Sequence, residues 1–567
     1  MRLGSWDLWP TTPTRTSKRE RAVDDLADLR KRIDDADSFH QQYYDDMDKW
    51  ERYYTGEEQH DELYTLMCEA GQSRLTSDIV TVNYLYSTVE HYIAQIAQSM
   101  PVPYVAGNDA SQDEASQAIT DYLHAYGRAT NIGGEQEMAY RSALVRGTGA
   151  LKVYWCPRRQ DVVVRNLPVN CIVPDPGAAR IEDCSFIALR NEYSEDLAVA
   201  LWPKLDLEHV EEVDPTRSVG VDTSSTTEVV KVLVWECYRE FGKRLTIFTS
   251  DQVLYDGENP TPGGRYPLTC FRLADREDCF WGQGLVERLQ VLQTDMNKLH
   301  TRMRIHHRFT TNPVVVTSSK KEINVTPGEV IRTETPDIRV DFLRPERIPP
   351  QVYDTLELDA RAIDSISGVH DITRGIRPKG VTAGISLDIL QQAAAVRLNG
   401  PARNWSFRMA GMWQAVLELS QKYAAGDLVA AGMMEGHAGM AVVPREMLSE
   451  ATVKYDEDGM PVVDPETGQP ELDFLPLPYH IVMQQQGELP LNAAAFAQTA
   501  IQLAQIRPEI DLQAILEAVK YPGRERLLQR LAANKQAELA GYMAAQGQMP
   551  GGATPPQAGM TPALQEA

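Results

Sequence analysis

The chain has 567 residues, of which 43% are hydrophobic, and it carries a formal net charge of −24. A chain of this length exceeds a single hydrophobic core, so we expect roughly three to five structural regions. The acidic balance argues against a protein that wraps nucleic acid tightly, because affinity for phosphate grows with each Lys or Arg contact. It is compatible with a duct through which DNA slides, and equally with a charge that only keeps a large protein soluble.

Two further classes are disfavoured by composition. No apolar run reaches the length of a transmembrane helix, and the first ten residues lack the apolar core of a signal peptide, so we expect an intracellular protein without membrane contact. The seven cysteines form no C-x-x-C pair and are odd in number, which argues against a zinc site and a disulfide framework. We expect them to be reduced structural residues.

Apolar residues at spacings of three and four predict helices in the first part of the chain. The predicted ranges are 18–55, 83–100, 113–127 and 135–145. The first is expected to end at Thr55-Gly56 and the second before Pro101. Between residues 146 and 272, runs that alternate apolar and polar side chains predict mostly antiparallel strands, interrupted by an acidic connection at 206–222.

The next hundred residues are the most informative part of the sequence. A helix at 282–308 places apolar residues alternately four and three positions apart, which predicts one continuous seam: Leu285, Leu289, Leu292, Met296, Leu299 and Met303. Short strands near 314–317, 330–332 and 338–342 follow, and a second amphipathic helix starts near residue 350. The small strands are marginal alone, so we expect another chain to complete their sheet. The seam fits either a buried core helix or a contact between subunits.

The remaining third mixes loops and helices. Glycines between 368 and 384 predict a mobile loop that carries Arg374, Arg377 and Lys379, for which phosphate contact is the hypothesis. A long helix at 386–424 should bend or break at Gly400-Pro401. An acidic stretch at 451–490 includes a hairpin tip at 456–459, a helical region covers 491–545, and Pro and Gly predict a disordered tail at 547–567.

The sequence offers little support for catalysis. It contains no phosphate-binding G-x-x-x-x-G-K-[ST] loop and no H-E-x-x-H, G-x-S-x-G or G-x-G-x-x-G motif. His306 and His307 point about 100° apart on a helix and cannot easily share a metal. The spacing of Asp364, Asp371 and Asp388 is not diagnostic of a two-metal nuclease, and carboxylates at helix ends and loop edges are usually caps or solvated charges. We therefore expect no enzyme activity, no metal and no cofactor.

The long helix is basic within an acidic chain. Five basic residues against Glu287 and Asp295 give it a net charge of +3: Arg288, Lys298, Arg302, Arg304 and Arg308. The last three lie near the C-terminal end of the helix, where positive charge complements the helix dipole. The sequence leaves open whether Lys298 and Arg302 face DNA or acidic neighbouring subunits.

Several linked segments resemble the portal proteins of tailed bacteriophages over about residues 40–545. The segments are Val82-Asn83-Tyr84, Ala143 through Val153, Pro174-Asp175-Pro176, Asp183-Cys184-Ser185-Phe186, Phe280-Trp281-Gly282-Gln283-Gly284 with Gln293 and Asn297, Ile366-Ser367-Gly368-Val369, and Gly380-Val381-Thr382-Ala383-Gly384-Ile385. Each is weak alone, whereas their order is fairly specific. An alternative class is a virion adaptor or nucleic-acid-binding structural protein without a channel, and an unrecognised hydrolase is a third.

The resemblance implies an α+β fold with long stem helices, an antiparallel β wing, a small β clip and a helical C-terminal crown, assembled into a ring. The implied regions are an N-terminal helical segment (1–60), wing (61–281), first stem helix (282–310), clip (311–348), second stem helix (349–369), tunnel loop (370–385), long wing helix (386–425), β return with the acidic hairpin (426–490), crown (491–546) and tail (547–567).

It also implies partners and site residues. The ring, usually of twelve subunits, would sit at one capsid vertex of the virion after assembly in the host cytoplasm. Double-stranded DNA would pass through it during genome packaging and ejection. The terminase large subunit, the major capsid and scaffolding proteins and head-tail adaptor proteins would bind it, with Lys320, Lys321 and Glu322 of the clip as docking candidates. The channel candidates are Arg374, Arg377, Lys379, Lys298 and Arg302, and the seam would pack subunits together in the stem.

Overall fold

The structure, a computed structural model, describes most of the first 484 residues. The described ranges are 19–98, 101–107, 112–203, 205, 231–250, 252–311, 314–317, 340–343, 346–369, 384–424, 426–434, 437–453 and 472–484. The chain divides into two compact units, Met1–Gly432 with Gly439–Leu489, and Met433–Ala438 with Pro490–Ala567. The predicted loop at 370–385 lies outside the described residues as far as residue 383, and its last two residues belong to a helix that begins at Gly384. The predicted helical region at 491–545 and tail at 547–567 also lie outside the described residues.

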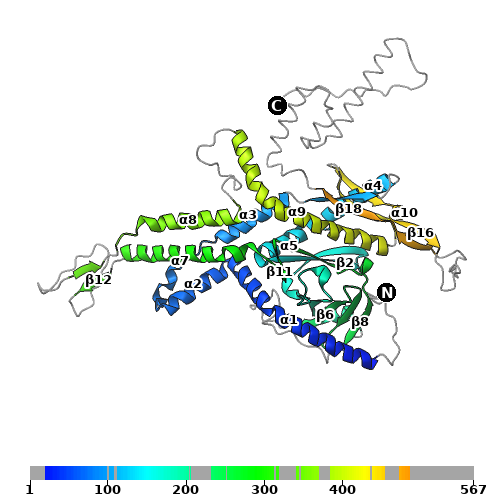
Figure 1. Cartoon of the computed structure of the whole chain (residues 1–567), viewed down its shortest axis with the longest axis horizontal. Helices are drawn as coiled ribbons and strands as arrows, with labels where there is room; N and C mark the ends of the chain where they lie inside the picture. The colour runs from blue at the N-terminus through cyan, green and yellow to red at the C-terminus, as the bar shows by residue number, and fades with distance from the viewer. Residues whose placement is uncertain are drawn as a thin grey trace, which may run out of the picture. The chain divides into compact units, whose positions relative to one another are not determined.

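Helices dominate the beginning of the first unit (Figure 1). They are α1 (Arg19–Thr55), α2 (Glu57–Glu69), α3 (Tyr84–Gln98), α4 (Asp113–Ala129) and α5 (Ile132–Arg146), with the 3-10 turn η1 (Ser73–Asp78) between α2 and α3. The four predicted helices are confirmed to within a few residues. Helix α2 was not predicted. It follows α1 directly, and the chain turns at Gly56, whose φ of 95° is the left-handed conformation that glycine adopts without strain.

Two antiparallel sheets follow, which confirms the β character predicted for 146–272. One has the order β3-β2-β9, from β2 (Thr148–Cys156), β3 (Asp161–Leu167) and β9 (Leu268–Arg272). The other has the order β4-β5-β6-β7-β8, from β4 (Ile172–Pro174), β5 (Ile187–Ser194), β6 (Lys231–Arg239), β7 (Arg244–Phe248) and β8 (Val253–Glu258). A hairpin of β10 (Ala274–Arg276) and β11 (Cys279–Gln283) leads out of the sheets. The short helix α6 (Glu195–Leu201) was not predicted, and the acidic connection at 206–222 lies outside the described residues.

The five-stranded sheet is covered on one face by the start of α1. The helix buries a stripe at spacings of three and four, Leu26, Leu29, Ile33 and Ala36, against Val173, Phe186, Ala188, Cys237 and Phe248. Glu236 of β6 forms an ion pair with Lys152 of β2, with 2.6 Å between Oε2 and Nζ, and both side chains are nearly buried. Tyr238 and Asn191 donate hydrogen bonds to the same carboxylate, which satisfies its lone pairs. All seven cysteines are free thiols.

Further along α1, His40 joins the helix to the strand that precedes the long helix. Its Nδ1 accepts a hydrogen bond of 3.0 Å from Nε1 of Trp281, and only 2% of the residue is exposed. Burial lowers the pKa of His40 to about 4, with a small opposing effect from the Pro174 backbone and the Asp175 charge. The imidazole is therefore neutral at physiological pH.

This burial predicts acid sensitivity. Because the pKa of His40 is lower in the folded chain than the 6.5 of the free side chain, the unfolded chain binds the extra proton. The free energy of unfolding should fall by up to about 3 kcal/mol as the pH falls from about 6.5 to about 4. His40→Asn keeps an acceptor for Trp281 but cannot titrate. Urea denaturation at pH 7 and pH 4.5 should show a smaller acid loss for the variant; equal losses in both proteins would contradict this role of His40.

The predicted order of long helix, small strands and second helix is confirmed where it is described. Helix α7 (Leu285–Thr311) leads to β12 (Val314–Thr317), which pairs antiparallel with β13 (Val340–Leu343), and α8 (Pro350–Ser367) follows. The strand predicted at 330–332 lies outside the described residues. Helix α8 ends at Gly368, where a φ of 78° allows the chain to leave the helix.

The bend predicted for the long helix is confirmed in α9 (Gly384–Tyr423). Pro401 lies inside the helix without ending it, and Figure 1 shows the helix changing direction along its length. After the proline, Trp405, Met409, Trp413 and Val416 are all nearly or fully buried. Their packing compensates for the hydrogen bond that proline removes.

The last described strands return to the helices near the start of the chain. They are β14 (Leu428–Met434), β15 (His437–Val443), β16 (Ser449–Val453), β17 (Leu472–Pro476) and β18 (Tyr479–Gln484), with α10 (Arg445–Leu448) before β16. Strand β18 pairs with β1 (Val102–Gly107), and β16 pairs with β17. The predicted hairpin tip at 456–459 lies outside the described residues. No helix in the described part of the chain is long and apolar enough to cross a membrane.

Helix side chains complete both edges of the β1–β18 pair. Thr120 of α4 accepts a hydrogen bond from the Val105 N–H, and His124, one turn later, bonds the Pro103 carbonyl. On the other side, the Gln414 amide of α9 bonds both the Ile481 N–H and the Tyr479 carbonyl. A two-stranded sheet is thereby stable without further strands at these positions.

Candidate functional site: an anchored pair of long helices

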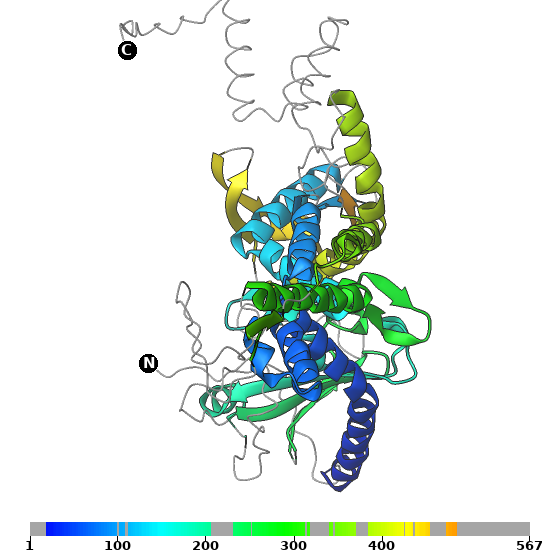
Figure 2. The ribbon, with the colours of Figure 1, turned by 90° about the vertical axis from the view of Figure 1, so that its left-hand side faces the viewer.

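Helices α7 and α8 lie side by side and run in opposite directions (Figures 1 and 2). Near the far end, the His306 ring bonds the Glu346 carbonyl at 2.5 Å. In the middle, the pKa of Asp359 is raised, mainly by burial and also by the nearby charge of Asp295. Near the base, Ile363 of α8 is completely buried. At 1.5 Å per residue, α7 alone is about 40 Å long.

The base of α7 is fixed by contact between backbones. Gly147 has a φ of 86°, and Gly282 and Gly284 lie against it: a Cβ on Gly282 would come within 2.5 Å of the Gly147 carbonyl oxygen, and one on Gly284 within 2.9 Å of the Gly147 nitrogen. The Gly282 N–H also donates to Thr148 Oγ1 at 2.9 Å. We call this contact the glycine crossing. It ties the start of α7 to the turn between α5 and β2, and only glycine allows so close an approach.

A second anchor follows along the same helix. Residues 79–83 connect η1 to α3, and together with Tyr84, the first residue of α3, they form a segment that we call the strap. Three polar side chains of α7 form hydrogen bonds with the backbone of the strap. Gln293 accepts a hydrogen bond from the Tyr84 N–H at 3.0 Å and donates one to the Val82 carbonyl at 2.6 Å. Asn297 accepts from the Val82 N–H at 3.0 Å, and Thr301 accepts from the Val80 N–H at 3.1 Å.

We call this row of hydrogen bonds between α7 and the strap the ladder. Its geometry follows from the spacing of residues along a helix and along an extended chain. The three side chains are four residues apart on α7, about 6 Å at 1.5 Å per residue. Their partners are two residues apart on the strap, about 6.6 Å in an extended chain. The spacings nearly match, so one row of helix side chains can serve an unpaired strand. Gln293, Asn297 and Thr301 are at most 3% exposed, as buried polar groups with partners should be.

The flanking positions fix the register of the ladder. Four residues before Gln293 stands Leu289, and four residues after Thr301 stands Ile305. A shift of the strap by two residues would place a backbone N–H against one of these apolar side chains and leave it without a partner. The sequence of α7 therefore specifies one alignment.

Helix α2 extends the network away from the strap. Asn297 Nδ2 donates to Gln59 Oε1 at 2.7 Å, and Gln59 Nε2 donates to the Tyr53 carbonyl at 2.7 Å. Thr294 donates to Glu62 Oε2 at 3.1 Å, and the Tyr53 hydroxyl donates to the same oxygen. Burial, followed by the hydrogen bond to Glu62, raises the pKa of Tyr53. The corner between α1 and α2 is thus bonded to α7 through buried polar groups.

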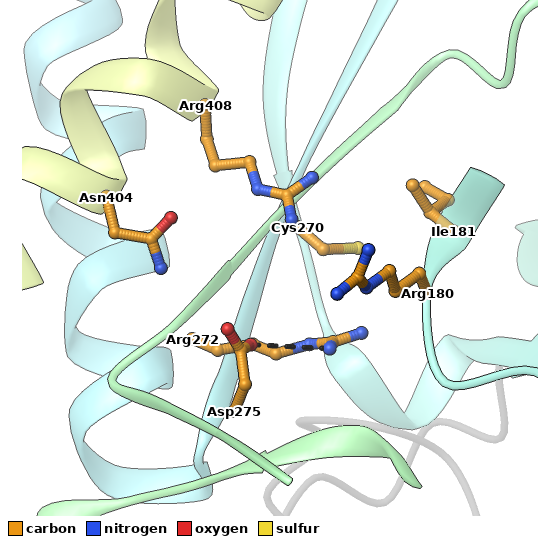
Figure 3. Close-up of a pocket in the computed structure, with 7 residues that line it drawn as sticks. All are labelled: Arg180, Ile181, Cys270, Arg272, Asp275, Asn404 and Arg408. Carbon is orange, nitrogen blue, oxygen red and sulfur yellow. Dashed lines mark hydrogen bonds and ion pairs between the residues drawn. The ribbon is translucent and has the colours of Figure 1, made fainter. Parts of the chain in front are cut away.

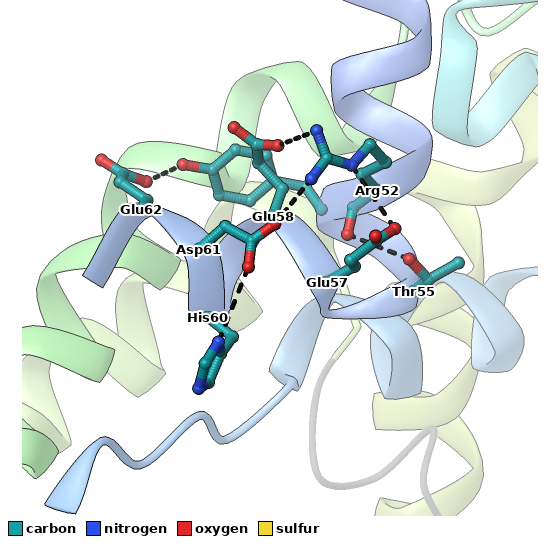
Figure 4. Close-up of polar contacts among 8 residues, drawn as sticks. Arg52, Thr55, Glu57, Glu58, His60, Asp61 and Glu62 are labelled. Atoms are coloured by element: carbon teal, nitrogen blue, oxygen red, sulfur yellow. Dashed lines mark hydrogen bonds and ion pairs between the residues drawn. The ribbon is translucent and has the colours of Figure 1, made fainter. Parts of the chain in front are cut away.

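The outer side of this corner is acidic (Figure 4). Arg52 of α1 bonds three carboxylates at the start of α2: Glu58 at 2.8 Å, Asp61 at 2.7 Å and Glu57 at 3.4 Å. The Arg52 side chain is 45% exposed, so each pair contributes little on its own. Beyond the strap, Arg308 of α7 bonds Asp78 at 2.5 Å. These surface pairs hold the corner and the strap in place around the buried ladder.

The predicted seam is largely used inside the single chain. Leu285, Leu289 and Met296 are buried, with at most 3% exposure, among elements of their own chain. Leu292, Leu299 and Met303 are half-buried. A side chain already buried offers no surface to a neighbouring subunit, so the role in subunit packing stays a prediction and has support only for the second group.

Of the basic residues predicted to face DNA, the structure describes Lys298 and Arg302 but not the three of the loop. Arg302 is exposed, and Lys298 is partly exposed and 3.8 Å from Asp295 within α7. Arg374, Arg377 and Lys379, and the clip residues Lys320, Lys321 and Glu322, lie outside the described residues, so their roles stay predictions. Sequence reasoning noticed Gln293 and Asn297 without a role, and it missed Gln59, Thr294 and Thr301. The available signal was a row of uncharged polar residues at four-residue spacing, with apolar Leu289 and Ile305 at its two ends.

A small pocket lies apart from the helical pair, where α9 meets the sheets (Figure 3). It is lined by Arg180, Ile181, Cys270, Arg272, Asp275, Asn404 and Arg408. Arg272 lies 3.4 Å from Asp275, and Arg408 lies 3.1 Å from Glu182. Two carboxylates therefore offset most of the positive charge. Among the described residues, no group of three or more His, Cys, Asp or Glu side chains could hold a metal ion.

Comparison with known families decides the identity of this arrangement. The family model described as phage P22-like portal protein matches residues 30–247 and 243–567 of the chain. The protein belongs to the P22-like portal protein family. The match covers the anchored helices α7 and α8, the strap and both sheets. As a portal protein, the chain is a structural component of a virion, and the mixed helix-and-sheet fold agrees with the predicted α+β class.

Two other comparisons complete the findings. A chain from the virion of a native gene transfer agent particle is similar to this portal protein with 11% sequence identity and a TM-score of 0.33. The similarity covers 59% of this chain and 77% of that chain. No curated protein matches the sequence.

Proposed function

We propose that this portal protein forms a ring at one capsid vertex, through which double-stranded DNA is packaged and later ejected. The observation that carries the proposal is the portal family match, which extends from residue 30 to the end of the chain. The ring would contain twelve copies, and twelve charges of −24 give about −288. An acidic wall repels DNA and leaves it free to slide.

In this proposal α7 and α8 are the stem, at 282–310 and 349–369, and 311–348 is the clip. The wing comprises 61–281 together with the long helix at 386–425, and 491–546 is the crown. The antiparallel pair α7–α8, joined through the β12–β13 hairpin, supports the stem and clip assignment. The glycine crossing and the strap support a stem that is rigidly joined to the wing.

In this proposal the tunnel loop binds DNA, whereas the clip binds protein partners. Arg374, Arg377 and Lys379 of the tunnel loop would touch DNA phosphates, because their charges stand out in an acidic chain. The clip, with Lys320, Lys321 and Glu322, would dock the terminase large subunit and then the head-tail adaptor proteins. The capsid and scaffolding proteins would bind elsewhere on the ring. The protein would be a passive conduit, with ATP hydrolysis left to the terminase.

Electron microscopy of the purified protein tests the assembly, and a loop variant tests the DNA contact. Negative-stain images and native mass measurement should show closed rings with a central pore. The triple variant Arg374→Gln, Arg377→Gln and Lys379→Gln should still form rings, because these residues are assigned to DNA, but a phage that carries it should package less DNA.

Three results would contradict the proposal at different points. A monomer or dimer under all conditions would favour an adaptor or nucleic-acid-binding protein without a channel. Unchanged packaging in the triple variant would remove the phosphate-contact hypothesis while leaving the ring. Nuclease or NTPase activity of the purified chain would instead favour an enzyme.

A further inference from the structure

The free surface of the helical pair carries opposite charges on its two helices. Helix α7 has five basic and two acidic residues, a net charge of +3. Helix α8 has one basic and four acidic residues, a net charge of −3. Within one chain, the like charge of Asp295 is near enough to Asp359 to help raise its pKa. The contact inside the subunit therefore does not account for the charge difference.

Each helix also has an exposed apolar residue beside its exposed charges. On α7, Val291 is 66% exposed, and at 100° per residue it falls within about 40° of Lys298 and Arg302. On α8, Leu358 is 61% exposed and falls within about 60° of Asp354 and Arg361. Single exposed apolar residues are common. Here, among the described residues, the unpaired charge beside Val291 is positive, on Arg302, whereas the unpaired charge beside Leu358 is negative, on Asp354. Each face also carries one charge of the other sign, Asp295 on α7 and Arg361 on α8.

Two of these charged groups lack partners in the single chain. Arg302 and Asp354 are both exposed, and neither has an ion pair or side-chain hydrogen bond within the part of the chain that the structure describes. Lys298 has only the long contact of 3.8 Å to Asp295, which is mostly exposed. Arg361 is paired with Glu357 on α8 itself. The unpaired charges are thus positive on α7 and negative on α8.

The unpaired charges also lie at matching heights along the pair. The charge of Asp295 is near enough to Asp359 to raise its pKa, which sets the approximate alignment of the two helices. Counting from these two residues at 1.5 Å per residue along antiparallel helices places Lys298 level with about residue 356 of α8 and Arg302 level with about residue 352. Asp354 lies between these heights, about 3 Å along the axis from each. Rotation about an axis parallel to the helices keeps each residue at its height, so a neighbouring copy would present Asp354 between the heights of Lys298 and Arg302.

We infer that the exposed face of α7, with Val291, Lys298 and Arg302, packs against the exposed face of α8, with Asp354 and Leu358, in a second copy of this chain. The inference rests on the proposed ring and names its stem contact. The contact joins two different surfaces, which is the type of interface that generates closed rings. It directs Lys298 and Arg302 toward an acidic neighbour and away from DNA.

Site-specific cross-linking tests the contact in the full-length protein. Lys298→Cys and Asp354→Cys are combined in a Cys68→Ser background, because Cys68 is the exposed native thiol. A short bis-maleimide should then join neighbouring subunits into a ladder of multimers on a denaturing gel. Each single-cysteine variant in the same background should give no ladder and controls for the other native cysteines.

Charge reversal gives an independent measurement of the same contact. Asp354→Lys and Lys298→Asp should each weaken ring assembly about fivefold per contact, since each places like charges together. The double reversal should restore assembly to within about twofold of the original. The ion pair Glu182–Arg408 lies outside α7 and α8, and exchanging its two residues provides a control in which the net charge of the chain does not change.

The outcomes separate the inference from the proposed function. Rings that form normally but give no ladder, and that tolerate both single reversals, would overturn the inference and leave the portal ring intact. Normal rings with a loss of packaged DNA in Lys298→Asp would instead show that this face meets DNA, which also overturns it. Absence of rings from the unmodified protein would contradict the proposed function itself.

Discussion

Replacing Gly149 by alanine is expected to prevent the protein from folding. A Cβ at this position would lie well inside van der Waals contact with the Ala139 carbonyl oxygen, and the clash is with backbone on both sides. Neither β2 nor α5 can move without disturbing the glycine crossing at Gly147. We expect a loss of more than about 4 kcal/mol in the free energy of unfolding. Soluble yield and urea denaturation followed by circular dichroism measure the effect.

Gly411 provides the matched control for this prediction. It lies within α9, and a Cβ there would meet nothing within 4 Å. Gly411→Ala should leave the fold intact and stabilise the helix by up to about 1 kcal/mol, because alanine has the higher helix propensity. If Gly149→Ala were as soluble and stable as Gly411→Ala, the close approach of α5 and β2 would be incorrect.

Replacing Gln293 by leucine should release the strap from α7. The variant keeps a side chain of similar size but removes the acceptor for the Tyr84 and Leu85 N–H groups and the donor to the Val82 carbonyl. These groups are buried or half-buried, and each unsatisfied group costs about 1 to 3 kcal/mol. We expect the free energy of local opening to fall by about 3 kcal/mol or more. Hydrogen exchange at the amides of residues 80–85 measures this directly.

The control for the strap uses another glutamine in the same pair of helices. Gln351 is exposed on α8, so Gln351→Leu should leave exchange at residues 80–85 unchanged. The ladder also predicts that Asn297→Leu speeds exchange of the Val82 amide more than that of the Val80 amide, which bonds Thr301. Uniform or unchanged exchange along the strap would contradict the rung-by-rung arrangement.

Local patterns in the sequence predicted much of the fold, because periodicity and turn residues determine where most elements begin and end. Helices α1, α3, α4 and α5 and the order α7, β12, β13, α8 were predicted, as was the antiparallel β region. Helix α2 was missed because only Gly56 separates it from α1. Of the two outcomes expected at Pro401, α9 bends and does not break, since the long-range packing of Trp405 and Trp413 holds the helix together beyond the proline.

The anchors of the candidate site could not be predicted in the same way. Gln293 and the strap are more than 200 residues apart, and the strap has no periodic pattern that reveals its partner. The glycines at 147, 282 and 284 were visible in the sequence, but they are needed because two backbones far apart in the sequence come into contact. The heptad pattern correctly predicted an apolar seam on α7. The sequence could not show which seam residues are already buried within their own chain and which remain available to a neighbouring subunit.

The ladder between α7 and the strap also has a mechanical consequence. Its rungs are spaced along the helix axis, and every rung crosses between two parallel tracks. A load applied along α7 stretches all rungs in shear at once, so they share it and fail together. A load applied across the strap opens them singly, like a zipper. The stem helix is therefore held firmly against pulling along its length, and its attachment is weakest against a force that peels residues 79–84 away from its side.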